Sequence, residues 1–345
     1  MTEFSLIDRY FRPLTNGFAP AMDLRDDAAA FPVPPMHDLV ITKDLLISGV
    51  HFIGDEPPSY IAQKALRVNL SDLFAKGALP YAYALGLALP RAKPKSGWWQ
   101  KSAPSNTPRI DDAWMAGFAT GLAEDQKNFA INLLGGDTTS GGDELVISIT
   151  AFGLVPKNQI TKRSGAKPGD VIFVTGSIGD AGLGLGLLQN RWGKILDHPD
   201  YEKLRRRYWI PEPRGKIIAA LRQAEAITAS ADVSDGLIAD LGHILAASGV
   251  GALLETALFP LSDAAKGIIK KLGLSLEDVA TFGDDYEIVF TVPSHKADLA
   301  FQLAPQVGIS ITRIGMVTFD QKLELYDENG NILNWQKTGY QHRIG

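Results

Sequence analysis

Aspartate recurs in this sequence at places where a strand or a helix is expected to meet a turn. Each aspartate taken alone has an ordinary explanation, because this side chain caps helices and forms turns. Their repeated placement points instead to a shared chemical task. The positions are Asp26, Asp27, Asp44, Asp72, Asp137 after Gly135-Gly136, Asp232, Asp235 after Ser234, Asp284 and Asp285.

Asp72 is the aspartate that capping explains least well. The spacing of apolar residues predicts a helix over residues 59–76. On this helix Asn69, Asp72 and Lys76 share one face, because they are spaced at i, i+3 and i+7. A carboxylate in the middle of a helix and beside an amide favours a ligand-binding role over a capping role.

Two further aspartates end predicted strands. Asp44 follows the strand "LVIT", and Asp232 ends the strand that leads into "VSDG". Ligands gather at the carboxyl ends of strands in α/β folds. Several carboxylate oxygens without cysteine suit a hard divalent ion such as Mg²⁺, which commonly binds carboxylates together with substrate phosphates. This pattern indicates phosphoryl transfer.

The common nucleotide-binding motifs are absent from the sequence. There is no GxxxxGK[ST] loop and no glycine-rich kinase loop with its partner motifs. The segment "TGSIGDAGLG" at residues 175–184 follows a predicted strand, but its glycine spacing differs from GxGxxG. We interpret these glycines as sites of close helix–strand packing.

Helical and strand patterns alternate along the chain, which predicts an α/β (α+β) architecture. The basic, Gly- and Pro-containing segment at residues 157–170 marks a boundary, so we divide the chain into domains at residues 1–156 and 157–345. In the first half we expect strands at 39–42, 83–89, 130–134 and 145–154 and helices at 59–76 and 111–126. In the second half we expect strands at 171–175, 250–255, 286–292, 309–317 and 322–326 and helices near 176–186, 214–227 and 236–247.

Composition agrees with two globular domains and excludes several classes of protein. The chain has 345 residues, and about 150 residues per domain is usual. With 45% hydrophobic and 21% charged residues, it is neither disordered nor fibrous. The net charge of −5 offers no overall attraction to nucleic acid or anionic lipid. Cysteine is absent, which rules out disulfides and thiolate metal sites and fits a reducing cytoplasm.

No membrane or signal segment is expected. A membrane-spanning helix needs about 20 apolar residues, and no stretch of this sequence qualifies. Residues 1–11 mix charged and apolar side chains, unlike a signal peptide, and predict an amphipathic first helix of a cytoplasmic protein. Residues 91–109, with Trp98 and Trp99, predict a long exposed loop that is either a surface excursion or a lid or partner contact.

Seven blocks of sequence, in this order, resemble the motifs of the thiamine-monophosphate kinase family. The resemblance runs from Phe4 to about Trp335. It implies two α/β domains built like aminoimidazole ribonucleotide synthetase, and a homodimer whose N-terminal domains pair into a β-barrel near the active site. The blocks are "DDAAAF", "TKDLLISGVHF", "KALRVNLSDLFAKGALP", "LLGGDTTSG", "TKRSGAKPGDVIFVTGSIGDAGLGL", "ADVSDGLIADLGHILAASGVGA" and "FGDDYEIVFTVP".

The resemblance also implies an activity and roles for single residues. The activity is phosphorylation of thiamine monophosphate to thiamine diphosphate, with ATP as co-substrate and Mg²⁺ as cofactor. No residue is expected to act as a general base, because the acceptor phosphate is already an anionic nucleophile. By position, the resemblance assigns Mg²⁺ to Asp27, Asp44, Asp72, Asp137, Asp232 and Asp235, ATP to Gly136, Asp137, Arg163 and Ser234, and thiamine monophosphate to His51, Asp284 and Trp335.

Four positions depart from the family pattern. Arg25 and Lys43 stand beside predicted metal ligands, where the family usually has a small residue. We expect their cations to replace part of a metal charge. Lys76 stands where the family has methionine and is expected to add charge near Asp72. Asp284 replaces a glutamate that is one methylene longer.

Two other functions stay open from the sequence. One is an ATP-dependent synthetase of the same superfamily, which would activate a carbonyl or amide oxygen. Relatives that depend on a terminal cysteine or selenocysteine fit less well, because this chain has neither. The other is a nucleotide-binding regulator whose catalysis is weakened by Arg25 and Lys43, although all six metal-type aspartates are present.

Overall fold

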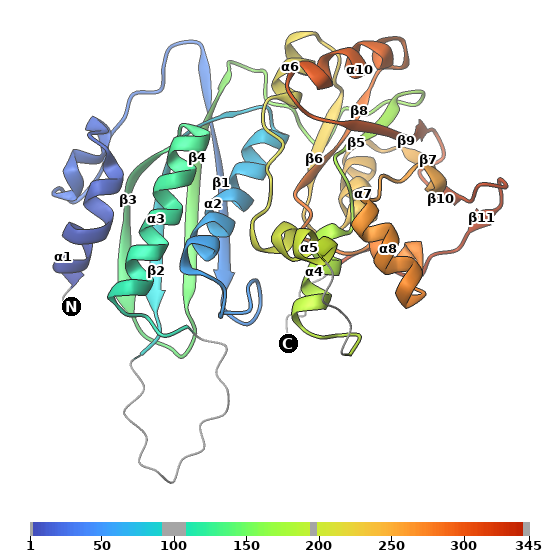
Figure 1. The fold of residues 1–345 in the computed structure, drawn as a ribbon. Coiled ribbons are helices and arrows are strands. Elements are labelled where there is room, and N and C mark those ends of the chain that lie inside the picture. The colour runs from blue at the N-terminus through green and yellow to red at the C-terminus, as the bar shows by residue number, and fades with distance from the viewer. Residues whose placement is uncertain (1–2, 92–107, 194–198, 341–345) are drawn as a thin grey trace. The chain divides into compact units, whose positions relative to one another are not determined.

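The structure is a computed structural model that describes residues 3–91, 108–193 and 199–340. The chain forms two compact units (Figure 1): unit 1 comprises residues 1–73 and 79–157, and unit 2 comprises residues 74–78 and 158–345. Most of the predicted loop that contains Trp98 and Trp99 lies outside the described residues. Among the residues described, no helix has the length and apolar character needed to cross a membrane.

Unit 1 is a four-stranded sheet with two long helices on one face (Figure 1). The strand order is β1-β4-β2-β3, in which β4 is antiparallel to both neighbours and β2 is parallel to β3. Before the sheet, short helical turns follow α1 at residues 7–15 and 19–24. The elements are α1 (Glu3–Leu6), β1 (His37–Ile47), α2 (Pro58–Ala75), β2 (Leu79–Leu89), α3 (Asp112–Phe129), β3 (Asn132–Ser140) and β4 (Val146–Pro156).

The side chains of β1 alternate between the two faces of this sheet. Val40 and Leu46 are buried, whereas Ile41 and Lys43 are exposed. Because successive residues of a strand point to opposite faces, Asp44 lies on the same face as Val40 and Leu46. Lys43 therefore lies on the opposite face from Asp44.

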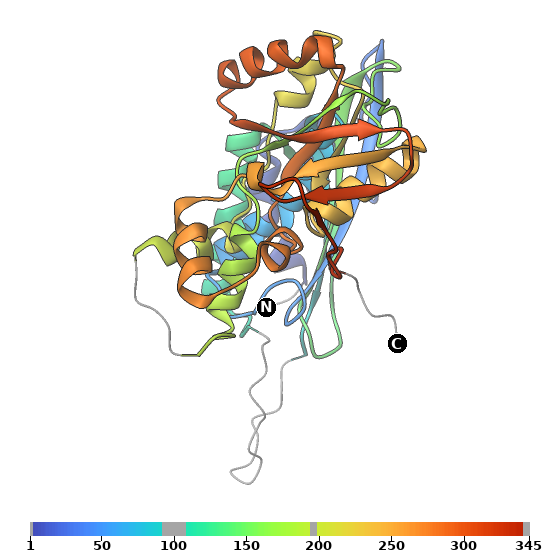
Figure 2. The same cartoon turned by 90° about the vertical axis from the view of Figure 1, so that its right-hand side faces the viewer.

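Unit 2 contains a seven-stranded mixed sheet in the order β11-β10-β7-β9-β5-β8-β6. Figure 2 shows β7, β9 and β10 of this sheet side by side. Its strands are β5 (Val171–Thr175), β6 (Ala229–Val233), β7 (Gly251–Glu255), β8 (Glu287–Val292), β9 (Ile311–Thr318), β10 (Leu323–Tyr326) and β11 (Ile332–Leu333). Its helices are α4 (Asp180–Leu188), α5 (Pro199–Trp209), α6 (Ile217–Gln223), α7 (Leu237–Ser248), α8 (Asp263–Leu272), α9 (Leu276–Ala280) and α10 (Ala297–Gln306).

Strand β5 is buried on both faces because helices pack on each side. Ile172 and Val174 join the core that contains the apolar residues of α7. Phe173 points the other way, where its ring stacks on Phe290 at 5.5 Å between centroids and meets Phe301 of α10 edge-on at 5.2 Å. This layering confirms the predicted α/β (α+β) class, and neither sheet closes into a barrel within the described residues.

The segment Phe74–Ala78, at the end of α2, packs with unit 2. The Ser230 hydroxyl donates to the Ala75 carbonyl, and Arg222 Nη1 donates to the Gly77 carbonyl at 2.7 Å. Lys76 Nζ donates to the Ser230 carbonyl at 2.7 Å. The Lys76 ammonium therefore binds the backbone of β6.

Candidate functional site

Asp44 and Asp72 form the first group of candidate site residues, on the helix-covered face of unit 1. The Thr42 hydroxyl of β1 donates to the Asp72 carboxylate of α2. The Asn69 side-chain oxygen accepts the backbone N–H of Asp44 at 3.2 Å. Burial, and secondly the negative charge of Asp72, raise the pKa of the Asp44 carboxyl to about 7. A divalent cation would relieve both effects, so this all-oxygen pair fits Mg²⁺.

The two cations expected beside the metal-type aspartates have other partners. Lys43 Nζ donates to Ser148 Oγ at 2.6 Å, on the sheet face opposite to Asp44. Arg25 Nε lies 3.4 Å from a carboxylate oxygen of Asp23, and both side chains are exposed. The contact of Lys43 corrects the expectation that its cation replaces part of a metal charge beside Asp44, because neighbouring strand residues point to opposite faces. For Arg25 the same expectation stays a prediction.

Asp27 and Asp137 line a second part of unit 1, a pocket of about 440 Å³. One side of the pocket is apolar and comes from the N-terminal helical turns, and the other side follows β2 and β3. A Cβ atom on Gly136 would lie 1.9 Å from the Leu85 carbonyl oxygen, so only glycine allows β3 to run this close to β2. The lining includes Ile7, Phe11, Ala21, Leu24, Asp26, Leu134, Gly135 and Thr138.

His51 is held near the end of β1. The backbone N–H of Ile47 donates to His51 Nδ1 at 3.0 Å. A neutral imidazole that accepts at Nδ1 carries its proton on Nε2. The ring is half-buried, and its orientation is set by this hydrogen bond.

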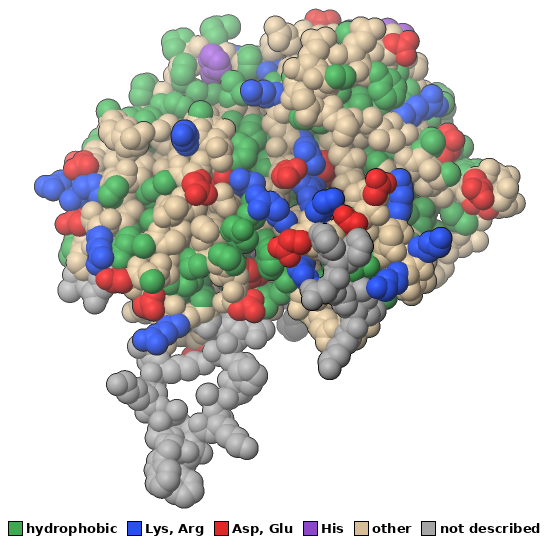
Figure 3. Space-filling view, viewed as in Figure 1, with side chains coloured by type: hydrophobic (Ala, Val, Ile, Leu, Met, Phe, Trp, Pro, Cys, Tyr) green, Lys and Arg blue, Asp and Glu red, His purple; other side chains and the backbone are tan. Residues whose placement is uncertain are grey.

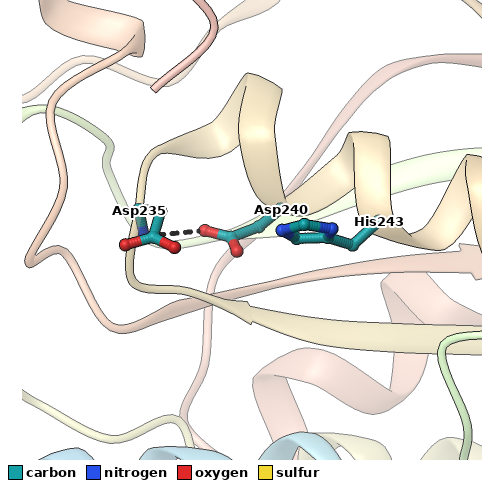
Figure 4. A group of neighbouring side chains, drawn as sticks. All are labelled: Asp235, Asp240 and His243. Atoms are coloured by element: carbon teal, nitrogen blue, oxygen red, sulfur yellow. Dashed lines mark hydrogen bonds between the residues drawn. The ribbon is translucent and has the colours of Figure 1, made fainter. Parts of the chain in front are cut away.

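In unit 2, Asp235 lies beside Asp240 and His243 at the start of α7 (Figure 4). One ligand atom of each side chain lies within 4.8 Å of the other two. Asp240 is buried, and its Oδ2 accepts the backbone N–H groups of Ser234 and Asp235, each at 2.9 Å. Burial raises the pKa of Asp240 to about 7 although these hydrogen bonds oppose the shift.

Asp240 and His243 are not among the residues that the sequence patterns predicted for the site. Their signal was available, because a spacing of three residues on a predicted helix places two side chains on one face. Asp232, which was predicted, lies outside this cluster. It is buried in β6 on the strand face of Ser230, whereas Ala231 and Val233 face the core beneath α7.

Asp284 lies in a loop with a left-handed backbone. Its φ is 69° and that of Tyr286 is 51°, a conformation that costs about 1–3 kcal/mol for residues with a side chain. The Asp284 N–H donates to the Ser234 carbonyl and the Tyr286 N–H to the Val233 carbonyl, both at 2.8 Å. This loop is thereby fixed against the turn that carries Ser234 and Asp235.

Trp335 and Arg163 have different environments in the same unit. Trp335 is half-buried against the core of unit 2 and meets Phe259 edge-on, with 6.2 Å between ring centroids. Arg163 is exposed, and its positive charge acts to lower the pKa of Asp240. Arg163 is therefore electrostatically coupled to the Asp235 cluster, whereas Trp335 is placed by packing.

The structure thus groups the predicted residues within each unit. Unit 1 pairs Asp44 with Asp72 and places Asp27 with Gly136 and Asp137 in one pocket. Unit 2 brings Ser234, Asp235 and Asp284 together by backbone hydrogen bonds. The ligand roles given to these residues stay predictions.

Two family models match the chain. The N-terminal domain of AIR synthase related proteins matches residues 25–155, and the C-terminal domain of the same proteins matches residues 167–328. The thiamine-monophosphate kinase of Caulobacter vibrioides is 41% identical over 344 residues, which is 99% of this chain and 91% of the relative.

Solved structures agree with these matches. The thiamine-monophosphate kinase of Stenotrophomonas maltophilia K279a has a TM-score of 0.79 and 36% identity, covering 96% of this chain and 98% of that chain. AaThiL complexed with AMPPCP and TMP has a TM-score of 0.74 and 26% identity, covering 98% of this chain and 97% of that chain. Because this similarity extends along nearly its whole length, the chain belongs to the thiamine-monophosphate kinase family.

Proposed function

We propose that this chain transfers the terminal phosphoryl group of ATP to the phosphate of thiamine monophosphate, giving ADP and thiamine diphosphate. The observation that carries this proposal is 41% identity to a thiamine-monophosphate kinase over 99% of the chain. The similar structure of AaThiL contains AMPPCP and TMP, which supports both substrates. The acceptor phosphate is itself the nucleophile, so the reaction needs no strong general base.

The carboxylates of both units are the proposed ligands of Mg²⁺. When bound, Mg²⁺ would neutralise charge on the phosphates of the substrates. The raised pKa of Asp44 beside Asp72 supports this role, because two close carboxylates that are poorly hydrated favour a cation. The proposed ligands are Asp27, Asp44, Asp72, Asp137, Asp232 and Asp235.

The remaining site residues are proposed to position the two substrates. The exposed guanidinium of Arg163 can bind phosphate oxygens in a bidentate manner, and Gly136, Asp137 and Ser234 are the other proposed ATP contacts. The proposed contacts of thiamine monophosphate are His51, Asp284 and Trp335, whose ring can stack on the cationic thiazolium. Catalysis then depends on orientation and charge neutralisation.

We also propose that unit 1 pairs with a second copy of this chain, with the two sheets forming a β-barrel. The face of β1 opposite the helices exposes Ile41 and Leu45, which are 59% and 48% accessible. Covering these apolar side chains would be favourable. In this proposal residues 1–156 form the dimerisation and ATP- and Mg²⁺-binding domain, residues 157–345 form the second domain, and the enzyme acts in the cytoplasm.

Sedimentation of the purified protein tests the dimer. Ile41→Asp is expected to convert a dimer into a monomer, whereas Phe319→Asp is a control because Phe319 is 85% exposed in unit 2. A wild-type protein that sediments as a monomer at micromolar concentration would contradict the dimer.

A coupled assay of ADP release tests the reaction. With ATP and Mg²⁺ present, thiamine monophosphate should trigger ADP release, and ³¹P NMR should show a new diphosphate. ADP release triggered by an amide or carbonyl substrate instead would favour a synthetase. Tight ATP binding without turnover would favour a nucleotide-binding regulator.

A further inference from the structure

A buried ionic cluster forms around Glu287, immediately after the Asp284 loop in the sequence. Glu287 begins β8 and is 0% exposed. Its two carboxylate oxygens accept from Arg214 Nε and Nη2, each at 2.6 Å, and from Arg207 Nη2 at 2.8 Å. The Thr175 hydroxyl of β5 donates to the same carboxylate at 2.6 Å.

The backbone at Gly176 packs closely against the Glu287 carboxylate. A Cβ atom on Gly176 would lie 2.3 Å from Glu287 Oε1, so glycine is required at this position. Burial lowers the pKa of the Arg214 guanidinium, but the hydrogen bonds and charge of Glu287 outweigh burial and raise this pKa above its usual value. The Arg214 guanidinium therefore stays positively charged beside Glu287.

Arg207 links this cluster to the backbone of the loop. Its Nη2 donates both to Glu287 Oε1 and, at 3.1 Å, to the main-chain carbonyl of Asp285. The Asp285 side chain is also buried and accepts the backbone N–H groups of Gly179 and Ala181 at the start of α4. The residue after Asp284 is thus held at both its carbonyl and its carboxylate.

These contacts surround the two left-handed residues of the loop. Asp284 and Tyr286 have φ values of 69° and 51°, and a strained backbone of this kind persists only where its surroundings fix it. The cluster supplies part of that restraint through Asp285, in addition to the hydrogen bonds of Asp284 and Tyr286 to Ser234 and Val233.

We propose that Arg207, together with Glu287 and Arg214, acts as a positioning group that holds Asp284 in the conformation that contacts the acceptor substrate. This inference rests on the proposed function, in which Asp284 binds thiamine monophosphate. Arg207 acts through the carbonyl of Asp285 and does not itself touch the substrate.

The main test is Arg207→Lys, which keeps the charge but removes Nη2, the guanidinium nitrogen that donates to both the Glu287 carboxylate and the Asp285 carbonyl. The KM for thiamine monophosphate should rise at least about fivefold, while the KM for ATP stays within about twofold. Arg205→Lys is the matched control on the same helix. Arg205 pairs at 3.5 Å with the exposed Glu202. Figure 3 shows basic and acidic side chains gathered over the region of α5.

A double-mutant cycle separates positioning from general stabilisation. In an Asp284→Asn background, Arg207→Lys should change the KM for thiamine monophosphate by less than about twofold, because the residue it positions is already altered. Equal effects in both backgrounds, or equal rises in both KM values, would overturn the proposal. Arg214→Lys provides a second test if Arg207→Lys does not fold, because the Arg214 guanidinium binds Glu287 and Glu212 and supports the same cluster.

Hydrogen–deuterium exchange gives a readout that does not depend on activity. Arg207→Lys should speed exchange of the Asp284 and Tyr286 amides relative to wild type, and Arg205→Lys should not. Unchanged exchange at these two amides would overturn the positioning role of Arg207. Wild-type protein that does not phosphorylate thiamine monophosphate, but shows the expected exchange, would contradict the proposed function and leave the positioning role supported.

Discussion

Asp125 in unit 1 and Glu287 in unit 2 are both fully buried carboxylates, and their surroundings differ. Asp125 of α3 is 0% exposed and accepts from Arg67 of α2 through Nε at 2.7 Å and Nη2 at 2.8 Å. This pair joins two regular helices. Glu287 binds two arginines and adjoins a loop with left-handed residues.

The difference shows two ways of placing site residues. In unit 1, Asp44 and Asp72 belong to a long strand and a long helix, whose geometry already fixes the direction of each side chain. In unit 2, Asp235 and Asp284 belong to irregular turns that have no repeating backbone pattern. Buried polar groups such as Asp240 and Glu287 must then fix these turns. We therefore expect unit 2 to depend more on residues that touch no ligand.

The largest expected effect is on folding stability. Glu287→Gln leaves two partly buried guanidinium groups with the exposed Glu212 as their remaining counter-charge and should lower the free energy of unfolding by about 3 kcal/mol. Asp125→Asn removes the partner of one arginine and should cost less. Urea unfolding followed by circular dichroism compares the two variants. A larger loss of unfolding free energy for Asp125→Asn than for Glu287→Gln would contradict the expectation that unit 2 depends more on its buried carboxylate.

Asp72→Asn should affect activity without affecting the fold. It removes a proposed metal charge but keeps an oxygen that can accept from Thr42. The kcat should fall at least about 100-fold, or about 2.7 kcal/mol, with the free energy of unfolding within about 1 kcal/mol of wild type. Steady-state kinetics and urea unfolding measure the two quantities. Activity retained within about threefold would argue against a metal role for Asp72.

Trp335→Ala should act on one substrate only. Loss of the stacking surface should raise the KM for thiamine monophosphate about tenfold and leave the KM for ATP within about twofold. Phe259→Leu is the control, since it alters the packing partner of Trp335 but keeps the indole ring. Equal changes in both KM values would remove Trp335 from the substrate site.

The smallest effect is expected for an exposed ion pair in the segment that carries Trp335. The hydrogen bond from Lys337, followed by that from Ser275, lowers the pKa of Asp278. A carboxyl whose pKa is lower in the folded state stabilises the fold above its unfolded pKa of about 3.9. This contribution is lost as the pH falls through the lower, folded pKa.

Lys337→Met should therefore reduce the free energy of unfolding at pH 7 by less than about 1 kcal/mol, because the pair is exposed and screened. The difference from wild type should vanish in strongly acidic solution. Urea unfolding at both pH values measures it. A loss at pH 7 as large as that of Glu287→Gln would remove the distinction between exposed and buried pairs.

Several elements could be predicted from sequence because their patterns are local. The predicted strand at 171–175 coincides with β5, and the predicted helix at 59–76 differs by one residue at each end from α2. The continuous apolar run of β5 and the apolar stripe along α2 are both strong sequence signals. The sequence patterns did not predict α5, α8 and α10. For α5 the reason is its highly charged sequence, in which Tyr201, Leu204 and Tyr208 are buried only once the surrounding helices are in place.

The sequence by itself determined which residue types are available for chemistry, the order of the motifs and the alternation of strands and helices. Tertiary structure decided where those side chains point and what fixes them. In the folded chain Lys43 donates a hydrogen bond to Ser148, 105 residues away in sequence, and Arg207 donates one to the carbonyl of Asp285, 78 residues away. Tertiary structure also joined Asp240 to the Ser234–Asp235 turn. The physical reason is range: periodicity reports the local backbone, whereas hydrogen bonds between distant segments exist only after the sheets and helices have packed.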